Sequence, residues 1–187
     1  HWSTNLGGTI ENPDCERTNA DELMLRWYQF AAFTPVFQGA ANGYELWDSP
    51  HKKNLANAIK LRYQLLPYIY NAAYHASVDH KNIMQALLFD FQYDEETHQL
   101  NQQYLFGPSL MVCPVTESGA KTISVYFPAD VTWIDFWTGK SYAGGTKADI
   151  TVSLDYIPVF VKQGSILPLE SFVSEHEVEE VPAVDTE

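Results

Sequence analysis

The sequence predicts a protein of two regions, a helix-and-loop region followed by an antiparallel β-sandwich. Apolar residues make up 45% and charged residues 19% of the 187-residue chain, a composition that excludes a largely disordered protein. Helical periodicity and loops fill residues 1 to about 80, whereas short β-type runs separated by Gly and Pro fill residues 83–168. The two parts of the chain therefore differ in fold class.

The first expected helix begins with the pattern of a capping box, in which Asn19 caps the helix and Glu22 follows three residues later. Pro35 ends it, because proline forces the preceding residue out of the helical region. A second helix is expected from Ser49-Pro50 to about Ser77, with a kink at Pro67.

Six strands are expected in the second region, and most are separated by Gly or Pro. Apolar residues alternate with polar ones in two of them, which indicates strands with one solvated face. Short strands at this spacing are typical of an antiparallel sandwich. The expected strands are Ile83–Phe89, Ser109–Val115, Lys121–Phe127, Val131–Phe136, Ile150–Leu154 and Ile157–Val161.

Charge and composition exclude several function classes. The chain has 11 basic and 24 acidic residues, so a nucleic-acid-binding face is not expected. No apolar run reaches the roughly 18 residues that a membrane span needs. The two cysteines, Cys15 and Cys113, do not have the spacing of metal ligands, and neither do the histidines. Two cysteines are compatible with any cellular compartment. The chain begins at His1 without an initiator methionine, as expected of a segment cut from a longer polypeptide.

Seven short motifs follow one another along the chain. The first reads Trp-Ser-Thr-Asn-Leu-Gly-Gly and is similar to the Trp-x-x-Asp-Ile-Gly-Gly stretch of glycoside hydrolase family 31. The third reads Arg-Tyr-Gln-Leu-Leu-Pro-Tyr-Ile-Tyr and resembles the Arg-x-x-Leu-Leu-Pro-Tyr-Ile-Tyr helix of the same family. All seven occur in family order, so the resemblance covers nearly the whole chain. They are Trp2–Gly8, Glu22–Pro35, Arg62–Tyr70, Tyr104–Val115, Trp133–Gly139, Ile157–Val161 and Gly164–Pro168.

The resemblance implies an α/β part followed by an all-β part. Residues 1–98 are expected to be the C-terminal part of a (β/α)8 TIM barrel, with Ile83–Phe89 as a late barrel strand. Residues 99–168 are expected to form the β-sandwich, and residues 169–187 an acidic linker or the start of a further domain.

The resemblance also implies a retaining α-glycosidase that acts on α-linked oligosaccharides or glycosides without a cofactor or metal. Such enzymes use two carboxylates, roughly 5–5.5 Å apart, as nucleophile and acid/base. In the family both precede the motif at which this chain begins, so no catalytic residue is expected in it. The chain alone is then expected to be inactive, and its partner to be the remainder of the same polypeptide.

Candidate substrate-binding residues lie at the first motif and in the loop after the first helix. Asn5 stands where the family usually has Asp, and Gln38 and Ala40 stand where it commonly has Arg and a sugar-gripping His. With Asn42 and Tyr44 of the same loop, they are expected to line the pocket that holds the reacting sugar. A simpler interpretation is that Asn5 only shapes a turn and that the loop is a variant around an intact pocket.

Two hypotheses follow from these departures. The first is an active enzyme whose specificity is shifted from α-glucose to an α-galactoside, an α-xyloside or an N-acetylated α-hexosaminide, or to transglycosylation. The second is a homologue whose active site has decayed and that binds carbohydrate or serves as a scaffold. Both carboxylates must be present upstream for the first hypothesis to hold.

Overall fold

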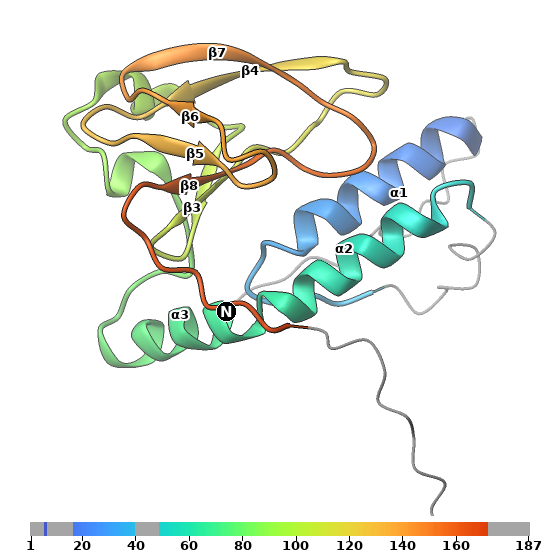
Figure 1. The fold of residues 1–187 in the computed structure, drawn as a ribbon, viewed down its shortest axis with the longest axis horizontal. Coiled ribbons are helices and arrows are strands. Elements are labelled where there is room, and N and C mark those ends of the chain that lie inside the picture. Colours follow the sequence, from blue (N-terminus) through green and yellow to red (C-terminus); the bar gives the residue numbers. More distant parts are fainter. Residues whose placement is uncertain (1–5, 7–16, 40–48, 172–187) are drawn as a thin grey trace, which may run out of the picture.

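The structure is a computed structural model that describes residue 6 and residues 17–39 and 49–171. Within these ranges three α-helices precede the strands, which are arranged in two sheets (Figure 1). The helices are α1 (Arg17–Ala31), α2 (Lys52–Gln64) and α3 (Leu66–Val78), with short 3-10 helices η1 (Leu87–Phe89) and η2 (Glu95–Gln99). The strands are β1 (Met84–Ala86), β2 (Tyr104–Phe106), β3 (Leu110–Val112), β4 (Thr122–Phe127), β5 (Trp133–Asp135), β6 (Ser141–Tyr142), β7 (Thr146–Thr151) and β8 (Val159–Lys162).

The first helix forms as expected, but the capping box is wrong. α1 begins at Arg17, so Asn19 lies within the helix, whereas an N-cap residue has non-helical backbone angles. Glu22 instead accepts hydrogen bonds from the Ser118 hydroxyl (3.2 Å) and the Gly119 backbone N–H (2.9 Å). The acidic side chain at this position therefore serves a tertiary contact and not a local cap.

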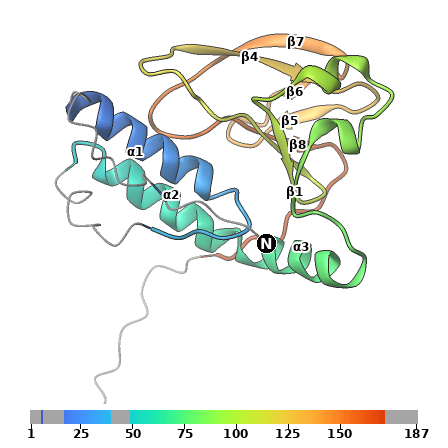
Figure 2. The same cartoon turned by 180° about the vertical axis from the view of Figure 1, so that it is seen from behind.

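The second expected helix is divided at the predicted kink. α2 ends at Gln64 and α3 begins at Leu66, and Leu65 between them is fully buried. Pro67 lies in the first turn of α3, where its missing N–H leaves no helical hydrogen bond unmade. The bend directs α3 beneath the sheet while α2 stays beside α1 (Figures 1 and 2).

The strands form the expected sandwich of two antiparallel sheets. The larger sheet has the order β1-β2-β3-β8-β5-β6, and β4 pairs with β7 over six residue pairs in the smaller one. Fully buried side chains from both sheets, including Met111, Val125, Phe127, Trp133 and Phe160, form the core between them. Two short strands, β2 and β6, were not predicted.

The assignment of Ile83–Phe89 to the barrel is wrong. Its first part is β1, which pairs antiparallel with β2 in the register Met84 to Phe106 and Ala86 to Tyr104, and its second part is η1. Strands of a TIM barrel are parallel to their neighbours, so this strand belongs to the sandwich. The larger sheet thus begins inside the range 1–98 that the resemblance assigned to the barrel.

A second core lies on the outer face of the larger sheet, where α3 packs (Figure 2). The Tyr68 hydroxyl of α3 donates to the Phe106 carbonyl oxygen (2.7 Å) and accepts from the Ser109 N–H (3.0 Å), so one side chain fastens the helix to the β2–β3 turn. Burial raises the pKa of Tyr68 to about 12, with its bonds to Ser109 acting in the opposite direction. This contact fixes the helical region against the sandwich.

Candidate functional site

The expected pocket region contains two neighbouring parallel segments joined by a helix. Leu6 forms a parallel bridge with Gly39, and its N–H donates to the Gln38 carbonyl oxygen at 3.3 Å. Leu6 is 1% exposed and packs with α1 and α2 residues such as Leu25 and Leu55. A parallel pair with a helix between its strands is the repeating unit of a (β/α)8 barrel.

This bridge locates the described part of the expected sugar pocket. Gln38 is exposed and lies directly beside Leu6, the residue that follows Asn5 in the sequence. Asn5, Ala40, Asn42 and Tyr44 lie outside the described residues. The backbone thus brings together the two segments that carry candidate residues, and the roles of the individual side chains stay predictions.

The turn that leads into Gln38 is held by a partly buried cation. Arg62 of α2 donates to the carbonyl oxygens of Ala32 (3.3 Å), Pro35 (3.0 Å) and Thr34. These carbonyls follow the C-terminus of α1, where the partial negative charge of a helix attracts a cation. Burial lowers the pKa of Arg62 to about 10, so the group remains charged at neutral pH. Arg62 therefore positions the segment that carries Gln38.

Several carboxylates in the described ranges have structural partners, and three of them join loops or elements of the fold. Asp94 accepts from the Tyr126 hydroxyl (2.9 and 2.8 Å) and the Ala129 N–H (2.9 Å). Asp135 accepts from the N–H groups of Trp137 (2.9 Å) and Thr138 (2.8 Å), and Glu22 binds the sandwich as described above. These carboxylates stabilise loops and junctions of the fold.

The described ranges contain no cluster of three or more His, Cys, Asp or Glu side chains that could hold a metal ion. None of the helices in them is long and apolar enough to cross a bilayer. Cys113 is a free thiol in the core of the sandwich, where burial raises its pKa, and Cys15 lies outside the described part.

Comparison with known proteins decides the family. Residues 1–72 match the model described as the glycosyl hydrolases family 31 TIM-barrel domain, and residues 80–167 match the family's C-terminal domain. The chain belongs to glycosyl hydrolase family 31. The resemblance of the seven motifs and the predicted fold class, a partial TIM barrel followed by a β-sandwich, are thereby confirmed.

Relatives within family 31 include enzymes with different names. The chain is 37% identical over 174 residues to an alpha-xylosidase of Saccharolobus solfataricus, covering 90% of this chain and 24% of that protein. It is also 37% identical over 175 residues to the human neutral alpha-glucosidase C, covering 90% of this chain and 18% of the relative. Among solved structures, a family 31 alpha-xylosidase from Xanthomonas citri matches with a TM-score of 0.75 and 39% identity, over 80% of this chain and 17% of that one. The chain thus spans a quarter or less of the length of these relatives.

In this family 31 chain, polar side chains of α1 and α2 hold the loops of the sandwich. Arg26, paired with Glu22 at 3.4 Å, donates to the Ser153 carbonyl oxygen (2.8 Å). Gln29 and Asn54 both donate to the Leu154 carbonyl oxygen, at 2.9 and 2.8 Å. Burial lowers the pKa of Arg26, while Glu22 beside it acts to raise it. These hydrogen bonds therefore hold α1 and α2 against the Ser153–Leu154 segment of the sandwich.

The motifs alone did not predict these positioning residues. Arg62 and Arg26 lie within the family motifs, and each is a cation among apolar helical positions. A charged residue in the buried stripe of an amphipathic helix is the signal that could have revealed them, since a buried charge requires partners. Which carbonyls they bind depends on loops distant in the sequence.

Proposed function

We propose that the chain forms the end of the catalytic barrel and the following β-sandwich of a retaining glycosidase that hydrolyses terminal α-linked sugars. The parallel bridge between Leu6 and Gly39 is the observation that supports this most directly, because it joins two parallel segments next to the residues expected to form the sugar pocket. The names of the relatives, an alpha-xylosidase and an alpha-glucosidase, support an α-linked substrate.

The nucleophile and the acid/base are proposed to lie in the polypeptide that precedes residue 1. Retention requires the two carboxyl groups to face each other across the anomeric carbon, roughly 5–5.5 Å apart. Active sites of TIM barrels lie at the C-terminal ends of the strands, where loops after different strands meet. This chain then supplies part of the pocket floor. The hydrogen bonds from Arg62 to backbone carbonyls hold one of the pocket segments in place.

The proposed pocket residues favour a sugar other than α-glucose. If Ala40 stands where the family grips a hydroxyl with His, the smaller side chain leaves space for a bulkier or differently oriented substituent. It also removes a charge-capable partner, worth roughly 1.5–3 kcal/mol for a hydrogen bond to a charged group. At about 1.4 kcal/mol per decade, the loss corresponds to roughly tenfold to hundredfold weaker selection for glucose.

The experiment that tests this function compares kcat/KM on matched aryl α-glycosides, using the full-length polypeptide that contains this chain. We expect one of the α-xyloside, α-galactoside or N-acetylated α-hexosaminide substrates to be preferred over the α-glucoside. The single variant Ala40→His should restore glucose selection only in part, because Asn5 and Gln38 also differ from the family, whereas a triple variant with Asn5→Asp and Gln38→Arg should restore more. A clear preference of the unaltered enzyme for the α-glucoside contradicts the specificity shift.

A further inference from the structure

A cavity of about 400 Å³, which we call the junction cavity, lies where the helices meet the sandwich. Asn57, Lys60 and Gln64 of α2 line one wall at positions i, i+3 and i+7, which fall along one face of an α-helix. Trp137 and the segment 155–157, both from the sandwich, line the other wall. The volume lies within the range of roughly 300–1,000 Å³ that is typical of small-molecule sites.

Two aromatic rings form the apolar part of the junction cavity. Trp137 and Tyr156 lie with their ring centroids 5.1 Å apart and their planes at 34°, and both side chains are partly exposed. The Trp137 Nε1–H donates to the Ile157 carbonyl oxygen at 2.7 Å, so the indole ring is held by the segment that carries Tyr156. The face of an aromatic ring is electron-rich and attracts the C–H groups that line one face of a pyranose sugar.

The polar part of the junction cavity has hydrogen-bonding groups that the fold leaves unused. Within the described ranges, the side chains of Asn57, Lys60 and Gln64 make no hydrogen bond. An amide side chain offers both donors and an acceptor, and a sugar hydroxyl does the same. On the opposite wall, Asp155 Oδ1 accepts from the Asn54 amide at 3.2 Å, which orients the carboxylate and leaves lone pairs for further donors.

The charges at the junction cavity favour a neutral ligand. Lys60 and Asp155 are the charged side chains among its described lining residues, and they have opposite signs. The carboxylate repels an anionic ligand, and the ammonium group repels a cationic one. Gln38, the candidate pocket residue within the described ranges, does not line this cavity.

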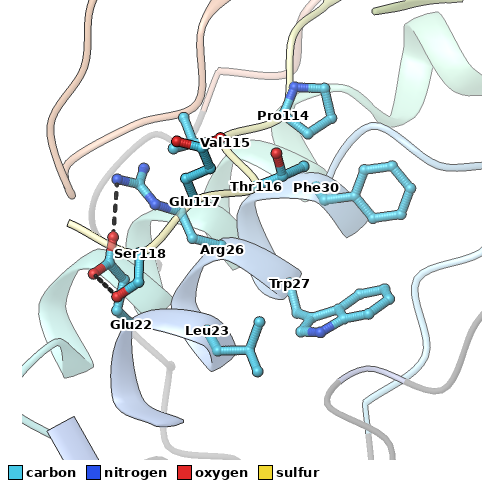
Figure 3. Close-up of a pocket in the computed structure, with 10 residues that line it drawn as sticks. All are labelled: Glu22, Leu23, Arg26, Trp27, Phe30, Pro114, Val115, Thr116, Glu117 and Ser118. Atoms are coloured by element: carbon cyan, nitrogen blue, oxygen red, sulfur yellow. Dashed lines mark hydrogen bonds and ion pairs between the residues drawn. The ribbon is translucent and has the colours of Figure 1, made fainter. Parts of the chain in front are cut away.

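A groove of about 480 Å³ between α1 and the Pro114–Ser118 segment has a different character (Figure 3). Leu23 and Trp27 contribute large apolar side chains to its helical wall. Glu22 and Arg26 at its edge pair with each other at 3.4 Å, as Figure 3 shows, so these two polar groups are already used by the fold. The junction cavity is therefore the better site for a ligand rich in hydroxyl groups.

We propose that the junction cavity binds a neutral α-linked oligosaccharide. The inference rests on the proposed function only for the α linkage, because the recognition of hydroxyl groups and sugar rings follows from the lining residues. A sugar ring stacks on Trp137 and Tyr156, while its hydroxyls exchange hydrogen bonds with Asn57 and Gln64 and donate to Asp155. Such a contact raises the effective concentration of sugar chains at the polypeptide.

Acylation of Lys60 in the full-length polypeptide tests the proposal at the cavity itself. Lys60 is exposed and lines the cavity, whereas Lys52, exposed at the start of the same helix, does not line it and serves as the control. Both lysines are acetylated with an N-hydroxysuccinimide ester at increasing concentrations of maltotriose or isomaltotriose. Sulfur replaces the glycosidic oxygens of both trisaccharides to prevent hydrolysis, and mass spectrometry gives the rate at each lysine.

We expect at least one trisaccharide to slow the acylation of Lys60 in a saturable manner and to leave Lys52 unchanged. The concentration for half-maximal protection should rise about tenfold in Tyr156→Ala and roughly threefold in Asn57→Ala, which removes an exposed side chain with no hydrogen bond in the described structure. Tyr93→Ala removes an aromatic side chain that is 93% exposed and does not line the cavity, so it should leave the protection unchanged.

Several results would overturn the proposal. A Lys60 that does not react without ligand would show that another part of the polypeptide covers the cavity. Protection by inorganic phosphate and by neither trisaccharide would identify an anion site, and unchanged protection in both Tyr156→Ala and Asn57→Ala would place the sugar elsewhere. Acylation does not depend on turnover. Protection in a polypeptide that hydrolyses no α-glycoside therefore counts against the proposed function alone, and hydrolysis without protection counts against this site alone.

Discussion

Replacing Gly107 with alanine is expected to destabilise the chain by about 4 kcal/mol or more. Gly107 has a φ of 61°, a left-handed conformation that costs a non-glycine residue roughly 1–2 kcal/mol. An added Cβ would also lie 2.5 Å from the Tyr68 hydroxyl oxygen and 2.8 Å from its Cζ. Tyr68 cannot move away without breaking its bonds to Phe106 and Ser109, so overpacking and lost buried hydrogen bonds add to the strain.

A matched control separates the collision from the backbone strain. Gly139 has a similar φ of 73°, but nothing lies within 4 Å of its added Cβ. The variant Gly139→Ala should therefore lose only the roughly 1–2 kcal/mol of left-handed strain. Urea unfolding, monitored by circular dichroism, gives the free energy of unfolding of both variants. An equal loss in the two would show that contact with Tyr68 does not restrict the residue at position 107.

The second large effect is expected from Arg62→Met, which removes a cation that binds three backbone carbonyls. Hydrogen bonds to charged groups contribute roughly 1.5–3 kcal/mol, and carbonyls left without a donor add to the loss, so we expect a destabilisation of roughly 2–4 kcal/mol. Because the Arg62 hydrogen bonds hold the segment Ala32–Pro35, kcat/KM of the full-length polypeptide should fall together with the stability.

The exposed Lys60 provides the control on the same helix. Lys60→Met removes a positive charge and adds the same apolar side chain, yet it breaks no hydrogen bond in the described structure and should change stability by less than about 0.5 kcal/mol. Thermal unfolding of both variants, with kcat/KM as the second readout, checks the difference. If the two variants behave alike, Arg62 has no special positioning role.

The sequence was sufficient for the elements with strong local signals. Helical periodicity ahead of Pro35 correctly predicted α1, and Pro67 correctly predicted the bend between α2 and α3. Glycines and prolines between the β-type runs correctly indicated an antiparallel sandwich. In each case the signal lies in residues that are close together in the sequence, although the strand pairings themselves join distant residues.

The errors concern interactions between residues distant in the sequence. Ile83–Phe89 has the composition of a strand, but nothing in it indicates whether its neighbour is a parallel barrel strand or the antiparallel β2. Asn19 and Glu22 match a capping pattern, yet Glu22 binds a loop 96 residues away. The partners of Arg62 and Arg26 were unpredictable for the same reason, and of the candidate pocket residues only Gln38 lies within the described ranges.

The central claim, that this chain supplies pocket and support while the catalytic carboxylates lie upstream, is tested most directly by assaying sugar release. The purified 187-residue chain should release no sugar from any aryl α-glycoside, whereas the full-length polypeptide should hydrolyse one of them with retention of anomeric configuration, as followed by proton NMR. Turnover by the purified chain that is abolished by substituting one of its own Asp or Glu residues would contradict the account.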